Sequence, residues 1–293
     1  MQRNELQNKV LSKISKKTLE TLNDEINKKK LPLWGLAKDQ NFENDCLLIA
    51  LYHDLFGVGY HKIESEVLSF LKISAKSIRH NTKIIRQSIQ DWCDAQIVLG
   101  SCSDWNQAAQ MLGKTEKKIE INLWINSSDF KKTQPENASK KSDEYSYKED
   151  HFANRFTCFS DANGRIRKLY GAYSPKVEDS AFMTLMKDEI ETSMEGAVML
   201  GDCGYESVVS KFRKINIVTP KSKQKDGRGI RKLTQKQKAR NKLLKSIRSR
   251  VECPLGDIKL TWKSLSSCFT EDDTQHSYVV KMAVAIRNFQ IKE

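Results

Sequence analysis

Hydrophobic residues in the first part of the chain recur at the spacing of an α-helix, with polar segments between them. Residues 1–30 carry a weak helical pattern within a strongly charged segment, and Pro32 interrupts it. From about Asp45, the stretch "DCLLIALYHDLFG" again has helical spacing and ends at Gly57, a residue typical of helix ends. We therefore expect a charged N-terminal segment over residues 1–30, helical or disordered, followed by an all-α region.

The all-α region, residues 31–100, contains the pattern of a helix-turn-helix module. Ile63, Val67 and Leu71 mark a short helix, a break follows at "KIS", and a second helix begins at about Ala75. The second helix would offer polar side chains that suit phosphates and base edges: Lys76, Arg79, His80, Asn81, Lys83 and Arg86. A small helical bundle with one solvated face would show the same pattern, but the basic second helix favours DNA binding.

From about residue 118 the pattern becomes that of β-strands. "IEINLWIN" alternates apolar and polar residues, and "RFTCFSD" and "RIRKLYGAY" are joined by an Ala-Asn-Gly hairpin turn. "GAVMLGD" (196–202) is continuously apolar, as expected for a strand buried in the middle of a sheet. Helical segments, among them a long one from about Thr234, would cover the sheet. Residues 118–293 are therefore predicted to form one α/β domain, a mixed sheet flanked by helices.

The charge of the chain is strongly positive and is concentrated in one block. Lys and Arg number 50 against 37 Asp and Glu, which gives a formal net charge of +13. Residues 221–250 contain 13 basic residues and one acid, Asp226, and so hold almost all of this excess. Such a block is often a solvated loop, but its size favours a polyanion, and nucleic-acid backbones are the commonest one. We expect a basic insertion at residues 221–240 and DNA contacts from Lys221, Lys223, Arg228, Arg231, Lys232 and Arg248.

Two further features bear on the location of the protein. No run approaches the ~20 apolar residues that cross a bilayer, and "MQRNELQNKV" lacks the apolar core of a signal peptide. The seven Cys residues are scattered without a Cys-x-x-Cys pair, which favours reduced thiols over disulfides or a structural zinc site. We therefore expect an intracellular protein without a membrane partner.

Two carboxylates stand where the predicted central strand and the last long helix end. Asp202 follows the buried strand, and open α/β sheets place their sites at this end of a strand. By itself, an Asp in this position is more often a cap of the next helix. Glu252 follows a helix whose other charged residues are basic, so it is either an ion-pair partner or a metal ligand.

Several segments in the second half of the chain resemble one transposase family. The succession "LWINSSDF", "FSDANGRI", "VEDSAF", "LGDCGY", "TPKSK" and "NKLLKSIRSRVECPLGDIK" is similar to DDE-type transposases of the PIF/Harbinger kind, over about residues 118–265. The resemblance implies a ribonuclease-H-like nuclease domain, usually preceded by a helix-turn-helix, that cleaves and joins DNA strands. It implies three carboxylates that hold two divalent ions, Mg²⁺ or Mn²⁺, on the first strand, after the fourth strand and on a later helix.

The resemblance also implies roles and partners. Asp202 would bridge the two metal ions, and Glu252 would complete the second metal site. Double-stranded DNA, such as transposon ends, would be the substrate, often with a separate DNA-binding accessory protein. A homo-oligomer and a nuclear location are further expectations of the same kind.

The first carboxylate is missing in this chain, because Asn126 stands at its position. An Asn offers a metal ion one neutral carbonyl oxygen and no negative charge. Asp129 is the nearest replacement, but residues an odd number apart point to opposite faces of a strand unless a bulge or turn intervenes. Asp161 and Asp179 are further candidates, with a hairpin end and a helix N-cap as alternative interpretations. The candidate catalytic residues are Asp202, Glu252, Asn126 and Asp129, and the candidate metal ligands are Asp202, Glu252 and Asp129.

Two functions of different classes follow from these observations. The first is a transposase-derived enzyme that cleaves and joins DNA with divalent metal ions. The second is a catalytically inactive transposase-derived protein that still binds DNA. A basic structural protein whose charged loop binds RNA is a third hypothesis, although no segment resembles an RNA-reading motif. Asn126 separates the first two, because only the enzyme needs another acid within reach of the metal.

Overall fold

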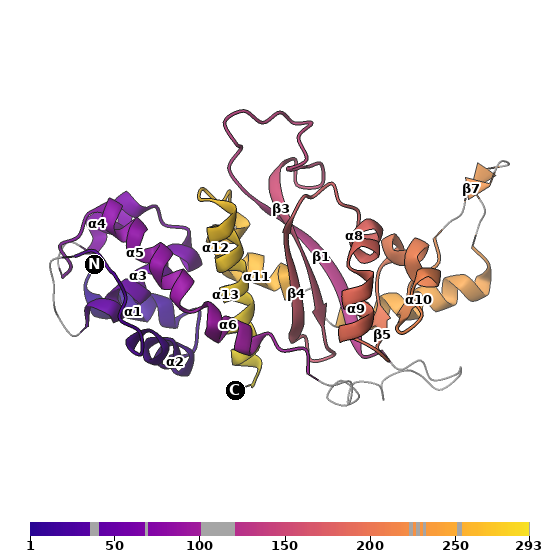
Figure 1. The fold of residues 1–293 in the computed structure, drawn as a ribbon, viewed down its shortest axis with the longest axis horizontal. Coiled ribbons are helices and arrows are strands. Elements are labelled where there is room, and N and C mark those ends of the chain that lie inside the picture. The colour runs from indigo at the N-terminus through magenta and orange to yellow at the C-terminus, as the bar shows by residue number, and fades with distance from the viewer. Residues whose placement is uncertain are drawn as a thin grey trace.

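Helices make up the N-terminal part of the chain (Figure 1). The computed structural model describes residues 1–35, 41–67, 70–100, 121–222, 225–226, 229–230, 233–250 and 254–292. Its first helices are α1 (Arg3–Leu11), α2 (Lys16–Asn27), α3 (Phe42–Phe56), α4 (Tyr60–Val67), α5 (Ala75–Ser88) and α6 (Gln90–Gln96). Helix α3 is central, and its Leu47, Leu51 and Leu55 are fully buried. Helices thus occupy the positions at which the hydrophobic pattern predicts them, whereas the use of α4 and α5 to read DNA stays a prediction.

A mixed β-sheet forms the centre of the second half of the chain. Its strands are β1 (Leu123–Lys131), β2 (Tyr145–Ser146), β3 (His151–Ser160), β4 (Ile166–Tyr173), β5 (Val198–Leu200) and β6 (Asn216–Val218). The strand order is β2-β3-β1-β5-β6, and β4 also pairs with β3. Strand β1 is antiparallel to β3 and parallel to β5, which is parallel to β6. The predicted mixed α/β fold is confirmed, and β1 joins the antiparallel half of the sheet to the parallel half.

Helices cover both faces of this sheet (Figure 1). The elements outside it are α8 (Asp179–Leu185), α9 (Lys187–Ser193), the 3₁₀-helix η2 (Cys203–Lys211), the hairpin β7 (Lys225–Asp226) and β8 (Gly229–Ile230), α10 (Gln235–Arg250), α11 (Pro254–Thr261), α12 (Lys263–Ser266) and α13 (Asp273–Lys292). Leu123 and Ile125 of β1 are buried in a core with residues of α8, α9 and η2. Trp124 points the other way and shares a core with Leu200 of β5 and Leu244 of α10. Alternate residues of β1 therefore face different helical layers.

The C-terminal helix α13 connects the helical region to the sheet. It packs against α2, α5 and α6 and also against β4 and α11. Asn288 of α13 is fully buried, accepts a hydrogen bond from the backbone N–H of Ile166, and donates to the carbonyls of Ile166 and Gln96. One hydrophobic core therefore runs from the N-terminal helices through α13 to Phe130 of β1. Among the described helices, none combines the length and the apolar character that crossing a membrane requires.

A buried ion-pair network holds α3, α5 and the start of α13 together. Arg86 of α5 has no solvent exposure and donates from Nε and Nη2 to the two carboxylate oxygens of Asp54 in α3, at 3.0 and 2.5 Å. Its Nη1 donates to Glu271, just before α13, at 2.8 Å, and Tyr60 of α4 donates to the same carboxylate at 2.6 Å. Because a buried charge is costly unless it is paired, these residues are structural.

Replacing Arg86 by Met should lower the free energy of unfolding by about 3–5 kcal/mol, because Asp54 and Glu271 then lose the cation that neutralises them. Urea denaturation followed by far-UV circular dichroism measures the loss. The control is Lys16→Ala, which breaks a solvent-exposed pair with Glu20 and should change stability by less than about 0.5 kcal/mol. A loss for Arg86→Met as small as that of the control would contradict the structural role.

Candidate functional site

Asn126 and Asp202 both lie just beyond the paired residues of β1 and β5. Trp124 pairs with Leu200, the last residue of the parallel strand β5, and both side chains are buried in a core with Leu244 of α10. Asn126 and Asp202 stand two residues further along their segments, past the last printed pair of the two strands. Helix α10 ends at Arg250, and Glu252 lies outside the described residues.

Asp202 has the position predicted for a site residue and also caps a helix. It follows β5 with an extended backbone (φ −80°, ψ −175°) and is the N-cap of η2. Its Oδ1 accepts a hydrogen bond of 2.8 Å from the backbone N–H of Gly204, and its side chain is partly exposed. The two interpretations of this residue are therefore compatible, since capping occupies only one of the two carboxylate oxygens.

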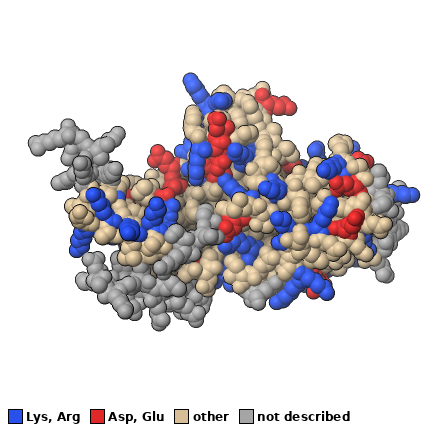
Figure 2. All heavy atoms as spheres, turned by 180° about the vertical axis from the view of Figure 1, so that it is seen from behind, with Lys and Arg blue, Asp and Glu red and all other residues tan. Residues whose placement is uncertain are grey.

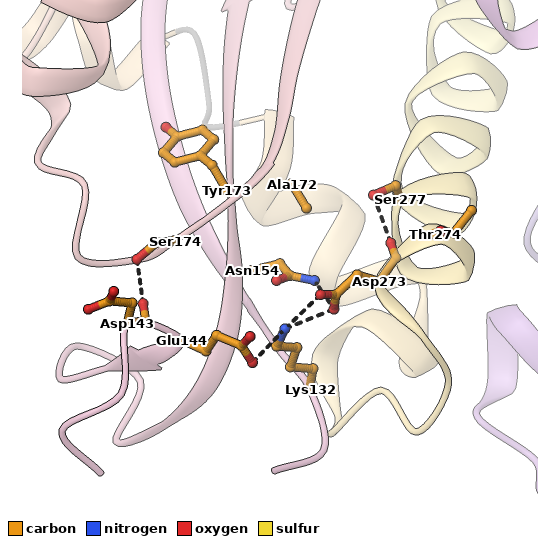
Figure 3. A pocket seen from close by; sticks show the side chains of 10 residues that line it. All are labelled: Lys132, Asp143, Glu144, Asn154, Ala172, Tyr173, Ser174, Asp273, Thr274 and Ser277. Carbon is orange, nitrogen blue, oxygen red and sulfur yellow. Dashed lines mark hydrogen bonds and ion pairs between the residues drawn. The ribbon is translucent and has the colours of Figure 1, made fainter. Parts of the chain in front are cut away.

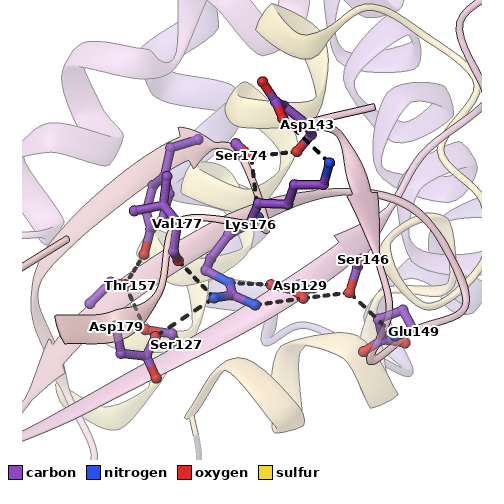
Figure 4. Close-up of polar contacts among 12 residues, drawn as sticks. Ser127, Asp129, Asp143, Ser146, Glu149, Thr157, Ser174, Lys176, Val177 and Asp179 are labelled. Atoms are coloured by element: carbon purple, nitrogen blue, oxygen red, sulfur yellow. Dashed lines mark hydrogen bonds and ion pairs between the residues drawn. The ribbon is translucent and has the colours of Figure 1, made fainter. Parts of the chain in front are cut away.

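Asp129 is buried in an ion pair with Arg155 of β3 (Figure 4). It is 1% exposed and lies directly opposite Arg155 on β3. Arg155 donates to both carboxylate oxygens, at 2.5 and 2.9 Å, and Ser146 adds a hydrogen bond of 2.6 Å. The pairing of β1 with β3 is continuous from Trp124 to Lys131, so no bulge turns Asp129 toward the face of Asn126. Its two oxygens stabilise the fold, and the hypothesis that Asp129 replaces the missing carboxylate gains no support.

Asp179 is the acid that comes close to Asp202. It begins α8, and its Oδ2 lies 3.7 Å from the point that a Cβ on Gly204 would occupy, while Oδ1 of Asp202 lies 3.0 Å from the same point. The distance between Oδ2 of Asp179 and Oδ1 of Asp202 therefore cannot exceed the sum of these two distances. Burial raises the pKa of the Asp179 carboxyl, and repulsion from Asp202 adds to the effect, while Ser127 and Arg155 oppose it.

Asp161 has the structural role that its hairpin position suggests. Its Oδ1 accepts hydrogen bonds of 3.0 Å from the backbone N–H groups of Asn163 and Arg165, and its Oδ2 pairs with Arg167 at 2.8 Å. These contacts close the turn between β3 and β4. Asp161 is therefore the hairpin-end residue, and both of its carboxylate oxygens are engaged.

The predicted DNA-binding residues of α5 divide into two groups. Lys76 and Arg79 are exposed, and Lys83 is partly exposed and paired with a carboxylate at 3.1 Å. Asn81 and Arg86 are 2% and 0% exposed, and their polar atoms bind a backbone segment and carboxylates inside the protein. The prediction that Asn81 and Arg86 contact DNA is therefore wrong, because burial leaves them no polar atom for a base or phosphate.

Exposed positive charge is carried by α10. Leu244 and, in part, Ile247 bury one stripe of this helix, and the exposed cations are Lys236, Lys238, Lys242, Lys245 and Arg248. Lys221, which precedes β7, pairs with Glu206 at 3.1 Å. Several residues with predicted roles lie outside the described part of the chain: Lys223, Arg228, Arg231, Lys232 and Glu252. On the face shown in Figure 2, Lys and Arg are spread along the whole molecule, with fewer Asp and Glu between them.

A cavity of about 410 Å³ lies away from these carboxylates, between the end of β4 and the start of α13 (Figure 3). Lys132 on its wall is 5% exposed and pairs with Asp273 at 2.8 Å and Glu144 at 3.0 Å. Its lining contains neither Asn126 nor Asp202. The cavity is therefore separate from the candidate site at the end of β5.

The donor atoms at the end of β5 can be compared with the needs of two divalent ions. Such a pair requires several anionic oxygens in near-octahedral arrangements. The structure brings together two carboxylates, Asp179 and Asp202, and Asn126 supplies an amide at the position of the first predicted ligand. Within the described ranges, no three His, Cys, Asp or Glu residues are close enough to hold a metal ion. Glu252 lies outside these ranges, and without it the described residues alone do not supply a two-ion centre.

Comparison with known proteins identifies one family. A family model described as DDE superfamily endonuclease matches residues 125–288, which is more than half of the chain. The match begins in β1, next to Asn126, and ends in α13. No curated protein and no solved structure matches the chain.

Asp129 and Asp202 should respond differently to the same substitution. Asp129→Asn removes the charge that neutralises partly buried Arg155 and should lower the free energy of unfolding by about 3 kcal/mol. Asp202→Asn keeps an oxygen for the N-cap and should change it by less than about 0.5 kcal/mol. Urea denaturation of both variants checks this contrast, and equal losses would contradict the assignment of Asp129 to the fold.

Proposed function

Because the chain belongs to the DDE superfamily of endonucleases, we propose that it is a transposase-derived protein that binds double-stranded DNA and lacks a complete catalytic centre. The observation that carries this proposal is Asn126 on β1, which stands two residues beyond the last β1–β5 pair, as Asp202 does on the other segment. In the DDE-type transposases that this chain resembles, position 126 holds the first metal-binding carboxylate. The chain therefore has an amide where the reaction needs negative charge.

The physical reason for inactivity is electrostatic. Two divalent ions close together are stable only where anionic oxygens offset their charge. An amide oxygen contributes a dipole but no charge, and Asp129, the nearest acid on β1, is neutralised by Arg155. We derive no step of strand cleavage from this set of residues.

A ribonuclease-H-like topology is part of the proposal. The order β4-β3-β1-β5-β6 supports it, because three antiparallel strands are followed by two parallel ones, with helices on both faces. Asp202 after β5 and the end of α10 would then supply the second and third positions of the site. The PIF/Harbinger kind, a homo-oligomer, an accessory DNA-binding protein and a nuclear location stay predictions from the resemblance.

DNA binding is supported by the distribution of charge. Lys238, Lys242 and Lys245 are exposed on α10, the helix whose Leu244 shares a core with Leu200 at the end of β5. A phosphate backbone that follows this helix would pass the end of β5, where Asp202 lies. Such contacts release counterions, so the affinity should depend on salt concentration.

A second candidate function, retained DNA cleavage, is favoured by one observation. Asp179 and Asp202 approach the same point near Gly204, so a second carboxylate is available at the site although it does not come from β1. If Asp179 supplies the missing charge, cleavage requires it as well as Asp202.

Nicking of supercoiled plasmid with Mn²⁺ distinguishes the two functions. We expect the wild type to nick no faster than Asp202→Ala, and Asn126→Asp to nick more than about 100-fold faster, because the restored charge stabilises bound metal. The double variant Asn126→Asp/Asp202→Ala is the matched control and should be inactive. Wild-type nicking that is lost in Asp202→Ala would overturn the proposal, and its loss in Asp179→Asn would then establish the second function.

The salt dependence of duplex binding tests the role of α10. Replacing Lys238, Lys242 and Lys245 by Ala should make the slope of log affinity against log salt less steep by about 0.9 for each lysine that contacts a phosphate. Fluorescence anisotropy with a labelled duplex measures the slope. The control replaces three exposed lysines at the other end of the molecule, Lys16, Lys28 and Lys30, and should leave the slope unchanged. Affinity that does not vary with salt would refute DNA binding through phosphates.

A further inference from the structure

Trp34 is a large aromatic side chain that the fold holds at the surface. It is 47% exposed, although it is surrounded in sequence by residues that join the core of the helical region. Its backbone N–H donates to Oδ1 of Asn81 at 2.8 Å, and its carbonyl accepts from Nδ2 of Asn81 at 2.9 Å. Asn81 is itself buried in α5, so both backbone groups of Trp34 are fixed to that helix.

The indole lies on the solvent-facing side of α5. Its ring stacks on His80 with a centroid distance of 3.6 Å and an interplanar angle of 19°. Lys76 precedes His80 by four residues, which places both on one face of the helix, and Arg79 is the adjacent residue. Trp34 is therefore a fixed aromatic surface on the helix face that also carries Lys76, one turn away.

The charge around this surface is positive and uncompensated. In the described part of the chain, neither Lys76 nor Arg79 forms an ion pair, and both are exposed. Arg79 packs its guanidinium over the ring of Tyr60, at 5.2 Å from the centroid, which orients it without neutralising it. Lys83, one turn further along α5, differs because it pairs with Asp272 at 3.1 Å. The free cations are thus at the end of α5 that carries Trp34.

The isolation of Trp34 indicates what kind of ligand it fits. Among described residues 1–97, Trp34 is the only large apolar side chain that is exposed. A protein partner usually requires a contiguous apolar patch, whereas one planar ring on a basic helix suits a nucleobase with its phosphates.

We propose that Trp34, supported by His80 on the helix that carries the unpaired cations Lys76 and Arg79, stacks on an unpaired nucleobase of DNA bound along α5. The inference rests on the proposed DNA-binding function and names the form of DNA that this helix prefers. Unpaired bases occur in single strands and at distorted or open positions in a duplex. Both present the same aromatic face, which paired bases within a regular duplex do not.

Binding of labelled oligonucleotides to the full chain by fluorescence anisotropy tests this assignment. The probes are a mixed-sequence single strand, its perfect duplex, and the same duplex with an internal mismatched bubble. Trp34→Ala should weaken binding to the single strand and the bubble by about tenfold to 100-fold, because one stacked base is lost. Binding to the perfect duplex should change by less than about twofold, since its phosphate contacts remain.

Two further variants make the result interpretable. Trp34→Phe keeps an aromatic ring and should retain most of the affinity for the bubble, which a loss of folding would not allow. Tyr147→Ala removes another exposed aromatic ring, 72% exposed in the loop before β3, and should bind as the wild type does. Equal binding of Trp34→Ala and wild type to all three probes would overturn the stacking role while leaving DNA binding intact. An equal loss on the perfect duplex would overturn the preference for unpaired bases, and no binding by the wild type would refute the proposed function together with this inference.

Discussion

Hydrogen bonding of β1 on both edges is the constraint on which the candidate site depends. With β3 antiparallel on one edge and β5 parallel on the other, the strand cannot rotate, and its side chains alternate strictly between two helical layers. Trp124 is packed under α10, and Ser127 bonds Tyr205 on the opposite layer at 3.0 Å. Asn126 follows the parity of Trp124 and so shares its face of β1. Asp129 has the other parity, and its carboxylate is engaged by Arg155.

Burial then decides which charges are available for function. Asp129 and Arg155, like Asp54 and Arg86, neutralise each other inside the protein, and removing either member would leave a buried charge unpaired. Such residues position the elements around the site without taking part in it. Asp202 differs because it is partly exposed and a cap occupies only one of its oxygens.

Local patterns in the sequence predict the strands, the helices and the position of Asp202, because these depend on periodicity and on nearby turn residues. Long-range pairing is not visible in such patterns. Asn81 and Arg86 lie on a basic amphipathic helix and were therefore expected to face DNA. Their polar partners, the Trp34 backbone 47 residues away and Glu271 185 residues away, become apparent only in the folded chain. For the same reason, the sequence offers Asp179 only as one of several candidate acids. Its closeness to Asp202 depends on how α8 packs against η2.

Binding of Mn²⁺, followed by the loss of the free-ion signal in electron paramagnetic resonance, tests the missing charge at position 126 most directly and requires no DNA. Titrations of wild type, Asn126→Asp and Asp202→Asn compare the number of ions bound and their affinity. We expect Asn126→Asp to bind Mn²⁺ at least about tenfold more tightly than the wild type, because a carboxylate again stands at position 126. Binding of two ions by the wild type, or equal affinity of wild type and Asn126→Asp, would contradict it.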